Sequence, residues 1–138
     1  MKLNRRQTMI VAAGAAAVAA LPFRAFAAAE EAIAEFTGGA EVGEGGITLT
    51  APEIAENGNT VPIEVSAPGA ESIAVFADGN PVPAVATFFF GPLAAEQMAA
   101  TRIRLAGTQN VIAVAKMPDG SFVQASQEVK VTIGGCGG

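Results

Sequence analysis

Most of the chain from Ile47 onward consists of short runs in which β-branched and other apolar residues alternate with polar or small residues. Alternation with a period of two is typical of strands that bury one face. Turn-forming residues separate the runs, for example at residues 56–59 and 118–121. About seven strands spaced roughly 8–12 residues apart predict a single immunoglobulin-like antiparallel β-sandwich over residues 47–133. The expected strands cover residues 47–49, 61–65, 72–77, 85–90, 101–105, 111–115 and 122–133.

Residues 28–46 precede the sandwich and have a different composition. Residues 28–37 are rich in alanine and glutamate, which predicts a short helix that stops at Gly38-Gly39. The glycine-rich stretch that follows, up to Gly46, is expected to be a loop. Within the sandwich, residues 93–100 are expected to form a helical turn between the two sheets.

Three consecutive phenylalanines, Phe88, Phe89 and Phe90, end the strand expected at 85–90. Neighbouring residues of a strand point to opposite faces, so one sheet face cannot bury all three side chains. Either the chain bulges or is covered there, or at least one ring belongs to a surface that contacts a partner. We favour the partner surface.

Residues 1–27 have the layout of an export signal. A basic start with the pair Arg5-Arg6 is followed by an uncharged, alanine-rich stretch and by an A-x-A site at Ala25–Ala27. The alternative, a membrane anchor, fits less well, because the stretch is weakly apolar and shorter than the ~20 apolar residues of a spanning helix. The arginine pair resembles a twin-arginine signal. We therefore expect cleavage near Ala28 and a periplasmic protein that is not attached to the membrane after cleavage.

Loss of the signal makes the chain strongly acidic. The full sequence has 8 Lys and Arg against 13 Asp and Glu, and residues 1–27 hold four of the basic residues and none of the acidic ones. The net charge of the mature chain is therefore 4 − 13 = −9. Such a surface repels phosphate backbones, and no basic patch offsets it, so we expect no nucleic acid partner.

Most enzyme classes are disfavoured by the residue types that the chain lacks. It has no histidine, which excludes Ser-His-Asp and Cys-His catalysis and removes the commonest metal ligand. The glycine pairs at 38–39 and 43–46 lack the context of a phosphate loop. With a single cysteine the chain cannot form an internal disulfide, and an unpaired thiol in an exported protein indicates reactivity or intermolecular pairing.

That cysteine, Cys136, lies in a C-terminal arm between two pairs of glycines, Gly134, Gly135, Gly137 and Gly138. Glycine pairs near a chain end predict a slim, flexible tether that reaches about 10 Å beyond the last strand. The nearby C-terminal carboxylate and the acidic body cannot lower the pKa of this thiol, since that requires a cation or a helix N-terminus. A partner's active site would have to activate it, and we therefore interpret the arm as the attachment site of a carrier.

The motif Gly134–Gly138, together with the strand residues 129–133 before it, resembles the C-terminus of the SoxY family, the sulfur-carrier subunits of the periplasmic thiosulfate-oxidising system. Residues 55–58, 80–81 and 101–104 resemble further segments of that family. The resemblance implies a heterodimer with SoxZ, and thiosulfate joined oxidatively to Cys136 by the cytochrome enzyme SoxXA. It also implies release of sulfate by SoxB and oxidation of the remaining sulfur by SoxCD. The chain itself would be a substrate platform, not an enzyme, and would need no cofactor.

Two other interpretations stay open at this point. A terminal Gly-Gly also resembles ubiquitin-like sulfur carriers, which would use the carboxylate of Gly138 as a thiocarboxylate and would need ATP. The chain could also be an exported immunoglobulin-like binding module whose tail cysteine is incidental. Mass spectrometry of the native tail distinguishes all three.

Overall fold

The computed structural model describes residues 27–134. This part of the chain contains a helix over residues 27–37 and nine strands. The strands are β1 (Val42–Glu44), β2 (Thr48–Thr50), β3 (Ile54–Asn57), β4 (Val61–Ser66), β5 (Ser72–Ala77), β6 (Ala84–Phe89), β7 (Met98–Ile103), β8 (Gln109–Lys116) and β9 (Phe122–Ile133).

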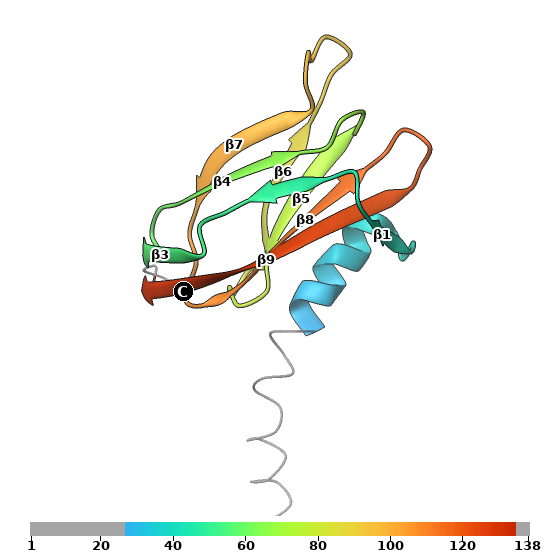
Figure 1. Cartoon of the computed structure of the whole chain (residues 1–138). Coiled ribbons are helices and arrows are strands. Elements are labelled where there is room, and N and C mark those ends of the chain that lie inside the picture. Colours follow the sequence, from blue (N-terminus) through green and yellow to red (C-terminus); the bar gives the residue numbers. More distant parts are fainter. Residues whose placement is uncertain (1–26, 135–138) are drawn as a thin grey trace, which may run out of the picture.

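The strands form two sheets that pack face to face (Figure 1). The larger sheet has the order β1-β9-β8-β5-β6, with β3 also paired to β9, and the smaller sheet has the order β2-β4-β7. The pairs β8–β9, β5–β8, β5–β6, β2–β4 and β4–β7 are antiparallel. The predicted antiparallel β-sandwich with a short N-terminal helix is confirmed.

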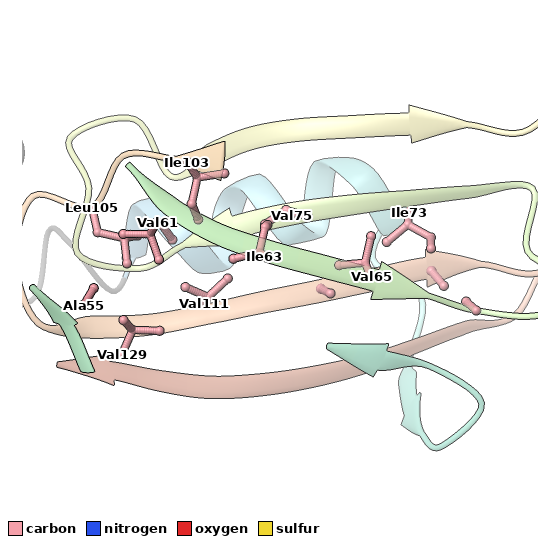
Figure 2. Close-up of a cluster of buried hydrophobic side chains, with 14 of the residues drawn as sticks. Ala55, Val61, Ile63, Val65, Ile73, Val75, Ile103, Leu105, Val111 and Val129 are labelled. Carbon is pink, nitrogen blue, oxygen red and sulfur yellow. The ribbon is translucent and has the colours of Figure 1, made fainter. Parts of the chain in front are cut away.

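The core lies between the sheets and follows from the alternation seen in the sequence. In β4, Val61, Ile63 and Val65 are buried, and the residues between them are exposed. Figure 2 shows these side chains among others of the core, such as Ile73 and Val75 of the larger sheet. Burial of such side chains is the main favourable contribution to the stability of a domain of this size.

The helix covers the outer face of the larger sheet. All six residues of β5 are buried, because Ile73 and Val75 face the sandwich core while Phe76 faces the helix. Phe36 of the helix makes edge-to-face contacts with Phe76 and Phe122, with ring centroids 6.2 and 5.8 Å apart. Such contacts add to the gain from burial alone. The second small core explains why β5 is apolar from Ile73 to Ala77 instead of alternating.

The helix ends before Gly38-Gly39, as the sequence predicted. Gly38 and Gly39 have φ values of 67° and 82°, in the left-handed region that glycine adopts without strain. The N–H of Gly39 donates to the carbonyl of Ala34 at 3.1 Å, which satisfies one of the last carbonyls of the helix.

Three local predictions were wrong. β1 occupies part of the expected loop, and β3 begins before the expected turn at 56–59 and includes its first two residues. Both are short and pair in parallel with β9, so their conformation depends on a distant partner and not on their own alternation. The helical turn expected at 93–100 is also wrong, because residues 98–100 begin β7 and pair with residues 64–66 of β4.

Candidate functional site

The chain enters the C-terminal arm from the end of β9, which is bonded on both edges. β3 pairs with β9 from Lys130 to Ile133, and on the opposite edge the hydroxyl oxygen of Thr108 accepts the N–H of Val131 at 3.0 Å. In Figure 1, β3 and the end of β9 lie together at one end of the sandwich. The start of the arm is therefore a fixed point on the protein body.

Gly58, which follows β3, connects this point to the segment after β7. Its N–H donates to the carbonyl of Ile133 at 2.7 Å, and its carbonyl accepts the N–H of Leu105 at 2.8 Å. Leu105 is fully buried, and Figure 2 shows it beside Val61 and Ile103. The last residue of β9 is thereby linked through the backbone of a single glycine to the backbone of a core residue.

The segment of residues 104–107, which we call the seat loop, is held by the side chain of Asn80. The amide oxygen of Asn80 accepts the N–H of Ala106 at 2.9 Å, and its amide nitrogen donates to the carbonyl of Arg104 at 2.8 Å. Asn80 lies in the turn between β5 and β6, far from the seat loop in sequence. One side chain thus fixes two backbone groups of the loop.

The buried side chain of Gln109 holds Asn80 in turn. Its amide nitrogen donates to the Asn80 side-chain oxygen at 3.0 Å and to the carbonyl of Gly107 at 2.9 Å, and its oxygen accepts the N–H of Gly79 at 2.9 Å. Next to it, Asp78 accepts two hydrogen bonds from Asn110, at 2.9 and 3.1 Å. Such a connected polar network is rigid because each buried group has its partner.

Gly134, the first arm residue, lies against the seat loop. A Cβ atom at this position would be 2.5 Å from the carbonyl oxygen of Ala106, closer than any side chain tolerates. The site therefore requires glycine for close approach and not only for freedom of movement. Cys136, Gly135, Gly137 and Gly138 lie outside the described residues, and their roles stay predictions.

The described residues contain no group of three His, Cys, Asp or Glu side chains that could hold a metal ion. Among the same residues, no helix is both long and apolar enough to cross a membrane. Hydrogen bonds from the side chain and backbone of Ser121 lower the pKa of the Asp119 carboxyl. Asp119 lies in the β8–β9 turn, at the opposite end of β9 from the arm, so it does not act on the arm.

The three phenylalanines separate as the period of a strand requires. Phe88 and Phe90 pack against the sandwich core, whereas Phe89 is 81% exposed. As expected, one face of the sheet does not bury all three rings, and contact of Phe89 with a partner stays a prediction. The one irregularity in the β5–β6 pairing lies between Val75 and Phe76, so a bulge does not account for the exposed ring.

Sequence reasoning missed the Asn80 network. Residues 78–81 come directly after the strand expected at 72–77, and Asp and Asn are common in turns for purely local reasons. Their bonds to residues 104–110 are long-range contacts that no local pattern specifies. One signal in the sequence was the pair Gln109-Asn110, two polar residues at the start of an apolar strand.

The fold and the site together define an all-β sandwich domain whose last strand leads, through a firmly held start, into a segment that carries its single cysteine. The family model described as "Sulfur oxidation protein SoxY" matches residues 33–136. The chain belongs to the SoxY family of sulfur carrier proteins.

Solved structures agree with this assignment. The sulfur carrier protein SoxY from Chlorobium limicola f thiosulfatophilum is 39% identical with a TM-score of 0.66, and the match covers 75% of this chain and 96% of that one. A superoxide reductase (neelaredoxin) from Ignicoccus hospitalis is 19% identical over 63% of this chain and 80% of its own, with a TM-score of 0.55. The hypothetical protein PH1083 from Pyrococcus horikoshii is 14% identical over 64% and 96%, with a TM-score of 0.53. These last two likenesses show the fold alone. A search of the curated proteins gave no match.

Proposed function

We propose that this chain carries sulfur intermediates of thiosulfate oxidation, bound covalently to Cys136, and presents them to partner enzymes. The observation that carries the proposal is that the SoxY family match extends to residue 136, the only cysteine of the chain. The arm starts from a fixed point at one end of the sandwich, which suits a thiol that must enter other proteins. The chain has no histidine, and we expect those partners to activate the thiol.

The loading step is an oxidation. The thiol sulfur of Cys136 forms an S–S bond with the outer sulfur of thiosulfate, giving Cys–S–S–SO₃⁻ and releasing one proton and two electrons. A c-type cytochrome partner of the SoxXA type would accept the electrons. In the next step, water attacks the sulfonate sulfur, the S–SO₃ bond breaks, sulfate leaves, and a persulfide stays on Cys136. A hydrolase of the SoxB type would catalyse this step, and SoxCD would oxidise the persulfide sulfur.

The heterodimer partner would be SoxZ, and the exposed edge of β6 supports a contact there. Among the described residues, β6 pairs only with β5. The N–H of Phe90 donates to the carbonyl of Glu71 at 3.0 Å, so the backbone groups of Phe89, the next residue in the alternation, point to the open edge. Leu93, in the β6–β7 connection, is 97% exposed, and Met98, at the start of β7, is 45% exposed. An open strand edge beside apolar side chains is a typical site for strand addition by a partner.

We also propose that the mature protein works in the periplasm after loss of residues 1–27. The export signal that supports this falls on residues before the described part of the chain, apart from Ala27.

The deciding experiment is intact-mass and peptide analysis of the protein isolated from cells that are metabolising thiosulfate. We expect reductant-labile adducts of sulfur, or of sulfur and oxygen, on the peptide that contains Cys136. The Cys136→Ser variant should fold with a stability within about 0.5 kcal/mol of the parent, as for other substitutions outside the core, and should abolish thiosulfate oxidation. Full activity of that variant, or an adduct on the Gly138 carboxylate instead, would exclude the proposal.

A further inference from the structure

We propose that Asn80 is a positioning residue for the C-terminal arm: it holds the seat loop so that Ala106 fixes Gly134 at the base of the arm. This inference rests on the proposed carrier function of the arm. It assigns different roles to the two glycines before Cys136, which the sequence alone treats as equivalent.

The first support is the number of independent contacts that meet at the seat loop. Asn80 bonds the backbone on both sides of Leu105, at Arg104 and Ala106, and Gly58 bonds Leu105 itself. These bonds come from the β5–β6 turn and from the end of β3, two segments distant in sequence. A loop held by polar groups from two directions keeps one conformation without help from the arm.

The second support is the close approach of Gly134 to the Ala106 carbonyl. Because a Cβ atom would be 2.5 Å from that oxygen, any other residue would have to push the start of the arm away from the loop or displace the loop. The seat loop cannot yield easily, since Ala106 is held by Asn80 and its neighbour Leu105 is fully buried. Gly134 therefore has a steric requirement that comes from its own protein and not from the cleft of a partner enzyme.

The consequence is a shorter and better aimed tether. Two Cα–Cα steps separate Gly134 from Cys136 and span at most about 7 Å, so a fixed Gly134 keeps the Cα atom of Cys136 within that distance. A short tether on a fixed base samples a small volume, which raises the effective concentration of the thiol at a docked active site. Because Asn80 bonds the backbone of the seat loop, we expect its effect to act through the direction and start of the arm.

The test uses a nitroxide label on Cys136, which is site-specific because the chain has one cysteine. We compare the rotational correlation times of the label in the purified mature chain and in four variants. Asn80→Ala removes three hydrogen bonds, and Gly134→Ala introduces the clash with Ala106. Gly135→Ala changes the neighbouring glycine, and Ser121→Ala removes a hydroxyl hydrogen bond at the opposite end of β9.

We expect shorter correlation times for Asn80→Ala and Gly134→Ala, and no shortening for Gly135→Ala or Ser121→Ala. Amide exchange at Ala106 should accelerate in Asn80→Ala. As a graded fifth variant, Asn80→Asp keeps an acceptor for that N–H and loses only the donation to Arg104, so it should lie between the parent and Asn80→Ala. Turnover with the partner enzymes should fall in Asn80→Ala while alkylation of the thiol by iodoacetamide keeps its rate.

An unchanged spectrum of Gly134→Ala would overturn the proposal whatever the Asn80 variants do, and this variant keeps the test valid if Asn80→Ala does not fold. An unchanged spectrum of a folded Asn80→Ala would also overturn it. The label reports on the arm whether or not sulfur is ever carried. Absence of cargo on Cys136 would therefore refute the proposed function and leave this result standing.

Discussion

Replacement of Phe89 by glutamate should weaken binding of the heterodimer partner without harming the fold. Phe89 is 81% exposed in the chain alone, so most of its ring gains nothing from the core of its own domain. Complete burial of a phenylalanine side chain is worth roughly 1.5–3 kcal/mol. Four-fifths of that range is about 1.2–2.4 kcal/mol, or roughly 8- to 60-fold in Kd, if the partner buries the ring. A carboxylate in the same place adds a desolvation cost, so these are lower bounds.

The assay is a titration of the purified chain with purified SoxZ, by calorimetry or sedimentation. Val82→Glu is the matched control, because Val82 is also an exposed apolar residue, at 71%. It precedes the start of β6, whereas Phe89 is the last residue of that strand. It adds the same negative charge to an acidic chain and should leave Kd unchanged. Thermal unfolding of both variants should match that of the parent. Equal affinity of Phe89→Glu and the parent would refute a partner surface at the β6 edge.

The remaining predictions concern export, the arm and the core. N-terminal sequencing of the protein purified from a periplasmic fraction should begin within a few residues of Ala28, and retention of the initiator methionine would contradict an export signal. Gly135→Leu or Gly137→Leu should leave thermal unfolding unchanged and lower turnover with the partner enzymes. The reason is that a narrow active-site channel that admits glycine would not admit the larger side chain. Equal turnover of the variants and the parent would show that no such channel limits access of the arm. Leu105→Ala should lower the free energy of unfolding by about 2–5 kcal/mol in a denaturant titration, because loss of the fully buried side chain leaves a cavity. A decrease below about 1 kcal/mol would show that the site collapses around the smaller side chain or is less tightly packed.

The sequence predicted the parts of this fold that depend on local alternation. β4, β5, β8 and β9 have the expected apolar positions, and most of their bounds lie within a residue or two of those predicted. The pattern of a strand is visible in its own residues whenever one face is buried and the other exposed, as in β4. The end of the helix could be predicted equally well from the glycine pair after it. Helices often end with a residue in the left-handed backbone conformation, and glycine is the residue preferred there.

The features that the sequence did not predict depend on partners distant in the chain. β3 is a strand because β9 lies beside it, and its residues Ile54 to Asn57 have no alternation of their own to indicate this. The role of Asn80 depends in the same way on Ala106, twenty-six positions away. The requirement at Gly134 was hidden for a different reason. Glycine in a tail suggests freedom, and only the position of the Ala106 carbonyl reveals a close approach.

The double pairing of β9 has a mechanical consequence. A thiol drawn into a partner's cleft transmits its load along the chain to the last strand of the domain. β8 is paired with β9 up to Val129, and β3 is paired with it over the final residues, Lys130 to Ile133. A pull along the axis of β9 therefore loads several hydrogen bonds in shear at once, instead of opening them one after another as when a strand is peeled from a sheet. Under the proposed carrier function, docking, cargo transfer and release would therefore put tension on the arm repeatedly without unravelling the domain.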